Sequence, residues 1–218
     1  MEHITRYALI ASKLRGKDGC CLTAFNAMRS AGEQAAALFK RRVRGAAPTV
    51  PGFAKCWRTG DWRVCMRIGL ISDTHGLLRP QASSFLDGCD HIVHAGDIGG
   101  ADVLENLASI ASVTAVRGNN DKGSWADSLA EAELLQFEEI FIYVIHDITQ
   151  IDIDPVSAGV HVVVSGHSHR PRVTERNGVL YVNPGSAGRR RFALPISIGE
   201  LVIDGASIVP RLSELDCA

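Results

Sequence analysis

The sequence contains no run of roughly 18 apolar residues, so it offers no candidate for a helix that spans a membrane. Its first apolar stretch, from Tyr7 to Ala11, is too short for the hydrophobic region of a secretory signal. The six cysteines form no CxxC pair and no zinc-finger spacing, which argues against a thiolate metal site and against a disulfide framework. A protein of the reducing cytoplasm without a membrane partner is therefore expected.

The length of 218 residues suits one domain or two small ones, and an apolar fraction of 46% is enough for a substantial core. The net charge of −1 hides an uneven distribution. Residues 1–65 hold 12 Lys and Arg against 4 Asp and Glu, whereas residues 66–218 hold 11 against 20. This difference predicts a basic N-terminal extension at 1–65 and a main domain at 66–218.

The basic extension gives weak structural signals. Ser30 and Glu33 have the spacing of a capping box, and the basic cluster at 40–44 with Gly45 after it suits the end of a helix. Two interpretations stay open. In the first, the extension is a genuine appendage that binds acidic partners or acts as a targeting signal. In the second, it is a segment that is poorly ordered or does not belong to the native protein. We favour the second, because Met66 opens the first strong strand signal.

From Met66 onwards, apolar runs alternate with polar or helical segments. The runs are Ile68–Ile71, His91–Ala95, Val113–Val116, Ile140–Ile145 and Val160–Val164, with helices expected near Pro80–Leu86 and Ala101–Ile110. This alternation favours parallel strands in an α/β layer architecture. Farther along, the Asn-Gly pair at 177–178 and the Asp-Gly pair at 204–205 each separate two strand-like runs, which predicts two hairpins.

Each of these five apolar runs is followed by side chains that can bind a metal. The candidates, in chain order, are Asp73 and His75, Asp97, Asn119, His146, and His167 and His169. In open α/β sheets, ligands bind beyond the carboxyl ends of the strands, so the five strand ends are expected to converge. Residues one apart in extended backbone point to the same side, so Asp73 with His75, and His167 with His169, are each expected to grip one ion.

Seven donors are more than one ion needs, since a transition metal takes at most about six and a structural zinc about four. With one bridging donor, they fit two ions about 3.5–4 Å apart. Imidazole and oxygen donors without sulfur favour Mn, Fe, Zn, Co or Ni over Mg or Ca. Two divalent transition metal ions are therefore expected as cofactors, with manganese as the first choice.

The ordered series D-x-H, G-D, G-N-x-D, H and G-H-x-H resembles the calcineurin-like metallophosphoesterases over the whole of residues 66–218. The stretch at 117–121 and the Asn-Pro-Gly-Ser at 183–186 are similar to the small bacterial phosphodiesterase branch. The resemblance implies a four-layer α-β-β-α sandwich of two mixed sheets, with a dimetal site at the strand carboxyl ends. It implies one metal on Asp73, His75, Asp97 and His169, a second on Asp97, Asn119, His146 and His167, and a bridging Asp97.

The activity implied is hydrolysis of phosphoesters, phosphodiesters first, by in-line attack of a metal-bridging hydroxide. A phosphomonoesterase is one alternative. A non-catalytic protein-binding scaffold, like the retromer subunit that shares this fold, is another, although all seven ligand positions keep competent donors. The expected partner is a small phosphate ester. Nucleic acid is disfavoured by the acidic main domain, and a homo-oligomer stays open.

The pattern departs from the family at two positions. Many members carry a histidine where this chain has Asn120, and asparagine cannot protonate a leaving group, so activated diesters are the expected substrates. The fourth motif is often His-Gly-His, but here His146 precedes Asp147. Catalytic roles are expected for Asp97, Asn119, Asn120 and Asp121. The substrate phosphate is expected to contact Asn119 and one or more of Arg189, Arg190 and Arg191. We interpret His91, His94 and His161 as structural.

Overall fold

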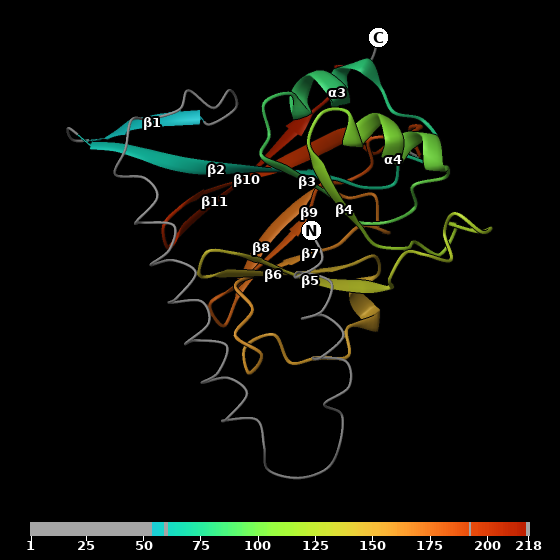
Figure 1. Ribbon diagram of the computed structural model, residues 1–218. Coiled ribbons are helices and arrows are strands. Elements are labelled where there is room, and N and C mark those ends of the chain that lie inside the picture. Colours follow the sequence, from blue (N-terminus) through green and yellow to red (C-terminus); the bar gives the residue numbers. More distant parts are fainter. Residues whose placement is uncertain (1–53, 59–60, 192, 217–218) are drawn as a thin grey trace. The chain divides into compact units, whose positions relative to one another are not determined.

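The computed structural model (Figure 1) describes residues 54–58, 61–191 and 193–216. The helix expected after Ser30 lies outside these ranges, as does most of the basic extension. No helix within the described ranges is long and apolar enough to cross a membrane.

The first sheet is built around one long strand. Its strands lie in the order β11-β10-β2-β3-β4, with β1 paired to the first half of β2. Their bounds are β1 Ala54–Arg58, β2 Asp61–Ile71, β3 His91–His94, β4 Ser112–Ala115, β10 Ser197–Asp204 and β11 Ser207–Glu214. β2, β3 and β4 run parallel, and the hairpin of β10 and β11 is antiparallel to β2. Since β2 begins at Asp61, the strand crosses the predicted domain boundary between residues 65 and 66.

The second sheet is also mixed, in the order β5-β6-β7-β9-β8. Its strands are β5 Ala132–Phe137, β6 Ile140–Ile145, β7 Val162–Val164, β8 Arg172–Arg176 and β9 Val179–Asn183. β6, β7 and β9 are parallel, whereas β5 and β8 are antiparallel edge strands. Both predicted hairpins, β8 with β9 and β10 with β11, are present. β5 escaped prediction because Glu133 and Gln136 interrupt its apolar residues.

Alternate residues of the parallel strands face two different cores. Ile68 and Leu70 of β2 and Val93 of β3 are buried between the sheets, against β6 and β7. Ile71 and Ile92 point the other way, toward the helices α3 (Pro80–Leu86) and α4 (Ala101–Ala108). This is the period-2 alternation of strands that are covered on both faces. Figure 1 shows α3 and α4 together on one face of the first sheet.

The outer face of the second sheet carries a smaller cluster that includes Tyr143, Val163 and Val179. Ile151 and Ile153 pack on it from the segment that follows a 3₁₀ turn, η1 (Ile148–Gln150). The predicted α/β sandwich of two mixed sheets is therefore confirmed. In the described part of the chain, its fourth layer consists of this turn and the irregular segment after it.

Candidate metal centre

The loop after β2 carries Asp73 and His75, and both residues adopt left-handed backbone, with φ of 54° and 47°. The expectation of extended backbone at this pair is wrong. The backbone N–H of Asp73 donates to the carbonyl of Gly96 at 3.0 Å, and that of His75 donates to the carbonyl of Asp97 at 2.9 Å. The loop therefore follows the neighbouring strand end instead of continuing β2. His167 and His169 are also left-handed, with φ of 63° and 57°.

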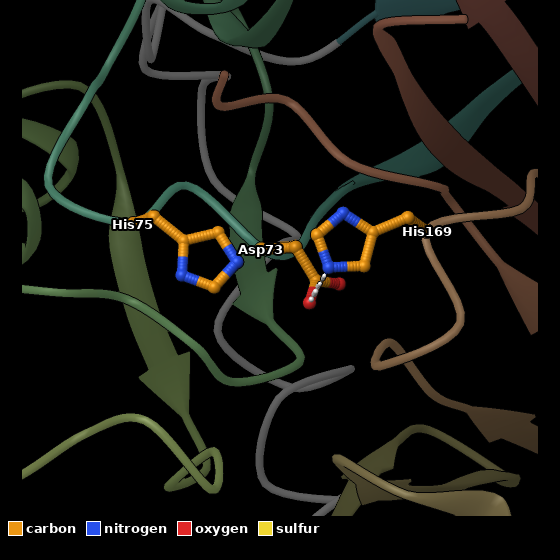
Figure 2. Close-up of side chains that lie close together, drawn as sticks. All are labelled: Asp73, His75 and His169. Carbon is orange, nitrogen blue, oxygen red and sulfur yellow. Dashed lines mark ion pairs between the residues drawn. The ribbon is translucent and has the colours of Figure 1, made fainter. Parts of the chain in front are cut away.

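Asp73, His75 and His169 form one compact group (Figure 2). Nε2 of His169 lies 3.2 Å from Oδ1 of Asp73, and the rings of His75 and His169 stack with centroids 5.4 Å apart. One ligand atom from each residue lies within 4.8 Å of the other two. Asp73 and His169 are buried. The geometry can hold one cation between a carboxylate and two imidazoles.

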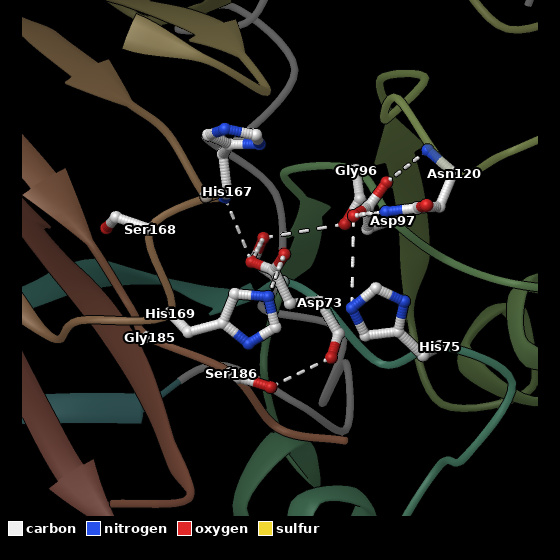
Figure 3. A network of polar contacts seen from close by, with 12 residues as sticks. Asp73, His75, Gly96, Asp97, Asn120, His167, Ser168, His169, Gly185 and Ser186 are labelled. Atoms are coloured by element: carbon white, nitrogen blue, oxygen red, sulfur yellow. Dashed lines mark hydrogen bonds and ion pairs between the residues drawn. The ribbon is translucent and has the colours of Figure 1, made fainter. Parts of the chain in front are cut away.

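Asp97 faces both this group and His146, and Figure 3 shows it beside His75. Its Oδ2 is 3.8 Å from Nε2 of His75 and 3.5 Å from Nε2 of His146. Asp73, Asp97 and His146 form a second group whose ligand atoms lie within 4.8 Å of one another. All three are buried, and Asp97 is only 2% exposed.

Asn119 and His167 complete the set. Oδ1 of Asn119 lies 3.1 Å from Nε2 of His146 and 3.0 Å from Nδ1 of His167. Nδ1 of His146 donates to the carbonyl of Ala95 at 2.7 Å, which leaves Nε2 as the atom that faces the cluster. The seven predicted donors therefore come together from five strand ends of two sheets. Their roles as metal ligands stay a prediction.

A family model described as the calcineurin-like phosphoesterase superfamily domain matches residues 66–205. The chain belongs to this superfamily. A probable metallophosphoesterase of Methanothermobacter thermautotrophicus is 33% identical over 156 residues, which cover 66% of this chain and 89% of that protein. A phosphodiesterase of Methanocaldococcus jannaschii is 27% identical over 55% of this chain and 83% of its own length.

The fold is also similar to solved structures. That of vacuolar protein sorting 29 from Cryptosporidium parvum covers 69% of this chain and 92% of its own, with a TM-score of 0.60 and 23% identity. At this identity, the likeness is evidence for the fold alone.

The superfamily implies divalent metal ions, and the cluster fits them. Oδ1 of Asp73, Nε2 of His75 and Nδ1 of His169 are buried without a hydrogen-bond partner within the described residues. Oδ1 of Asp73 and Nε2 of His169 are 3.2 Å apart, which is an ion-pair distance, but they do not form a hydrogen bond. Unpaired buried polar atoms are unfavourable, and a cation bound between Asp73 and His75 would remove the penalty at Oδ1 and at Nε2.

Hydrogen bonds hold both carboxylates in place. Oδ2 of Asp73 accepts from the hydroxyl of Ser72 at 2.6 Å and from the backbone N–H of His167 at 3.1 Å. Oδ1 of Asp97 accepts from the backbone N–H of Asn120 at 2.8 Å, and Oδ2 accepts from its side-chain amide at 2.6 Å. Each carboxylate is therefore oriented before any ion arrives.

Asp121 occupies a different environment from the one expected of a catalytic group. Its Oδ1 accepts from the backbone N–H of Gly99 and its Oδ2 from that of Gly118, each at 2.8 Å. The side chain is 5% exposed. These bonds tie the loop after β4 to the loop after β3, so Asp121 holds the loops that carry Asp97 and Asn119.

Burial governs the protonation of the cluster. It raises the pKa of the Asp73 carboxyl to about 6 and lowers that of His169 to about 4. It also lowers the pKa of His75. Burial by itself raises the pKa of Asp97, but hydrogen bonds with His146 and Asn120 hold it well below its ordinary value. Neutral His75 and His169 beside an ionised Asp97 are the forms that bind metal. For His146, burial lowers the pKa, but hydrogen bonds with Asp97 and Ala95 raise it above its ordinary value.

The arginine loop that follows β9 lies against the loop of Asp73. The backbone N–H of Ala187 donates to the carbonyl of Ser72 at 3.0 Å, and Nε of Arg79 donates to the carbonyl of Gly188 at 3.1 Å. The three arginines at 189–191 are exposed. The charge of Arg191 contributes, after burial, to the lowered pKa of both His75 and His169. Of the three arginines, Arg191 therefore has the largest effect on the pKa of these two histidines.

Three residues that support the site were not predicted to do so. Ser72 holds Asp73, as described above. His94 is completely buried, and its Nε2 lies 2.9 Å from the hydroxyl of Thr74, whose own hydrogen donates to the carbonyl of Ile98. The side-chain amide of Asn183 donates to the carbonyl of Gly166 at 2.6 Å, which fixes the loop of His167 and His169. For Asn183, the Asn-Pro-Gly-Ser motif was the available signal.

Proposed function

We propose that this chain is a two-metal hydrolase that cleaves phosphodiesters. The observation that supports it most strongly is the convergence of seven oxygen and nitrogen donors, of which Oδ1 of Asp73 and Nε2 of His75 are buried without a hydrogen-bond partner among the described residues. Membership of the calcineurin-like phosphoesterase superfamily supports phosphoester hydrolysis in general. The diester preference and the two-metal arrangement are specific to the proposal.

In the proposed centre, Asp73, His75 and His169 hold one divalent ion, and Asn119, His146 and His167 hold the other. Asp97 would serve both ions, because its Oδ2 faces His75 of the first group and His146 of the second. Asp73 is close to both groups, but its Oδ2 is already used by Ser72 and His167, so only Oδ1 is available to an ion. When bound, the two ions supply hydroxide near neutral pH and neutralise charge on the phosphoryl oxygens.

The protein's own groups orient the reaction. Asn119 and Arg191 are both exposed, and each adjoins the cluster, Asn119 through His167 and Arg191 through its charge on His75 and His169. In the proposed centre they would contact non-bridging phosphoryl oxygens. The backbone and side-chain amides of Asn120 hold Asp97 in place. We assign Asp121 to the support of these loops, and Arg189 and Arg190 to the outer part of the substrate path.

Asn120 predicts a preference for esters with good leaving groups. An asparagine amide cannot transfer a proton to a leaving oxygen, so the reaction depends on leaving groups that depart without help. The choice of diesters over monoesters is supported by the similarity to a phosphodiesterase of Methanocaldococcus jannaschii.

The alternative is a scaffold that keeps the fold without turnover, and the likeness to vacuolar protein sorting 29 is the observation in its favour. We favour the enzyme because the donor set here is complete and its carboxylates are held in place by hydrogen bonds.

The test is a hydrolysis assay on the full chain, depleted of metal and then supplied with Mn²⁺, Zn²⁺, Co²⁺ or Ni²⁺. Bis(p-nitrophenyl) phosphate and p-nitrophenyl phosphate are compared side by side, with Asp97→Asn as the matched control. We expect metal-dependent cleavage that is faster for the diester and lost in the control. Cleavage of neither ester with any metal points to the scaffold, and faster cleavage of the monoester refutes the diester preference.

A further inference from the structure

The carboxylate of Asp147 is fixed in place at the end of β6, directly after His146. Its Oδ1 accepts a hydrogen bond from the backbone N–H of Thr149 at 2.9 Å and another from the hydroxyl of Thr149 at 2.8 Å. Its Oδ2 lies 3.8 Å from Nε2 of His167. Thr149 therefore holds one oxygen of Asp147 so that the other faces the histidine.

The two ring nitrogens of His167 face different groups. Nδ1 lies 3.0 Å from Oδ1 of Asn119, inside the cluster, whereas Nε2 faces Asp147. The backbone N–H of His167 donates to Asp73, which fixes the start of the side chain but not its ring. With 47% of its side chain exposed, His167 is the least buried histidine of the four, the others being 16%, 5% and 9% exposed. Its ring therefore depends most on a partner to hold it.

His146 provides the comparison. Its Nδ1 donates to the carbonyl of Ala95, and this bond directs its Nε2 into the cluster. For His167 the group in the corresponding outer place is the carboxylate of Asp147, at a distance of 3.8 Å, which is that of an ion pair and longer than a hydrogen bond. In the His-Gly-His form of the fourth motif, a glycine stands at the position of Asp147 and has no side chain that could face His167. The arrangement is therefore particular to chains that carry an acceptor at this position.

We propose that Asp147 is a positioning residue for the second metal subsite: it accepts the Nε2–H of His167 and thereby directs Nδ1 at the ion. The inference rests on the proposed function, since it requires that subsite. An imidazole whose outer N–H is bound to a carboxylate has a fixed tautomer and a more basic ligand nitrogen. Loss of such an outer partner weakens metal affinity by about 10–100-fold.

The first measurement is a Co²⁺ titration of the metal-depleted full chain by calorimetry. Asp147→Asn is expected to weaken one of the two binding steps by about 10–100-fold and to leave the other unchanged. Thr149→Val, which removes the hydroxyl bond to Asp147, is expected to weaken the same step by less. Glu175→Gln removes an exposed carboxylate of β8 on the same sheet and is expected to change neither step.

The second measurement separates positioning from simple loss of a negative charge. In the Zn²⁺-loaded protein, two-bond ¹H–¹⁵N spectra report the tautomer of each histidine. We expect His167 to carry its proton on Nε2 in the wild type, with that proton exchanging faster in Asp147→Asn. Two strong steps in the wild type that are unchanged in Asp147→Asn overturn this inference alone. Equal weakening of both steps, or a His167 proton on Nδ1, also overturns it. Fewer than two steps in the wild type overturns it together with the two-metal proposal.

Discussion

The side-chain amide of Asn120 donates to Oδ2 of Asp97 at 2.6 Å, the same oxygen that faces His75 and His146. The position that often carries a histidine in this superfamily therefore serves here to hold the proposed bridging carboxylate. Asn120 thus replaces a residue that could donate a proton with one that holds Asp97. This replacement is the reason for expecting substrates with good leaving groups.

Restoring the histidine tests that link. Asn120→His is expected to raise kcat/KM by at least about tenfold for diesters with poor leaving groups, because an imidazolium can protonate the departing oxygen. For p-nitrophenyl leaving groups, little gain is expected. The measurement is the dependence of kcat/KM on the leaving group's pKa across a series of aryl diesters. An equally steep dependence in Asn120→His and wild type contradicts the assigned role of Asn120.

The buried carboxylate of Asp73 predicts a conflict between stability and metal uptake. Burial raises its pKa to about 6, so above that pH the metal-free fold contains an unfavourable charge. The unfolded group has a pKa of about 3.9, which makes the penalty about 3 kcal/mol at most at neutral pH.

Asp73→Asn removes this charge and keeps an oxygen that can accept from Ser72. We expect the variant to melt several degrees higher than wild type in EDTA at pH 7.5. On addition of Mn²⁺, the wild type is expected to gain stability and the variant to gain little. A lower melting temperature of the variant in EDTA contradicts the prediction.

His94 predicts a loss of stability in acid. Its complete burial lowers the pKa of the imidazole to about 3, against about 6.5 in the unfolded chain. Between these values the unfolded state binds a proton that the folded state does not. This contribution is therefore complete above about pH 6.5 and is lost as the pH falls toward 3, by about 1.4 kcal/mol per pH unit.

The comparison uses urea unfolding of metal-free wild type and His94→Gln at pH 7 and pH 5. Between these two pH values, the wild type is expected to lose about 2 kcal/mol more than the variant. The comparison uses the change in the free energy of unfolding between the two pH values in each protein. A destabilisation of the variant that is the same at both pH values therefore does not affect the result. Equal losses in the two proteins contradict the low pKa of His94.

The arginine loop predicts unequal effects of three neighbouring substitutions. Arg191→Ala is expected to raise KM about tenfold, because it removes one charge-assisted hydrogen bond to a phosphoryl oxygen. Arg189→Ala and Arg190→Ala serve as matched controls and are expected to change KM less, because Arg191 is the arginine with the largest charge effect on His75 and His169. Steady-state kinetics on one diester is sufficient. A larger effect at Arg189 or Arg190 contradicts the assignment.

Most of the fold follows from the sequence because buried parallel strands are continuous apolar runs. The helix at Pro80–Leu86 was predicted with its observed bounds, since proline suits the first turn of a helix. β5 was missed because an edge strand that is half exposed lacks such a run. The outermost layer on the second sheet also gave no periodic signal, and it consists of a turn and irregular chain.

The site was predictable in its membership more than in its geometry. Strand ends of parallel sheets meet, and this placed the seven donors together. The left-handed backbone at Asp73 and at His167 depends on hydrogen bonds to loops that are distant in the sequence, so local spacing could not reveal it. For the same reason, the sequence could not distinguish Arg191 from its two neighbours. The structural interpretation of His94 is consistent with its bonds to Thr74 and Gly96.

Anomalous diffraction from crystals of the full chain soaked in Mn²⁺ tests the two-metal centre most directly. We predict two manganese peaks about 3.5–4 Å apart, one beside Asp73, His75 and His169 and the other beside Asn119, His146 and His167, with Asp97 between them. A single peak, or manganese bound only elsewhere at saturating concentration, contradicts the two-metal proposal.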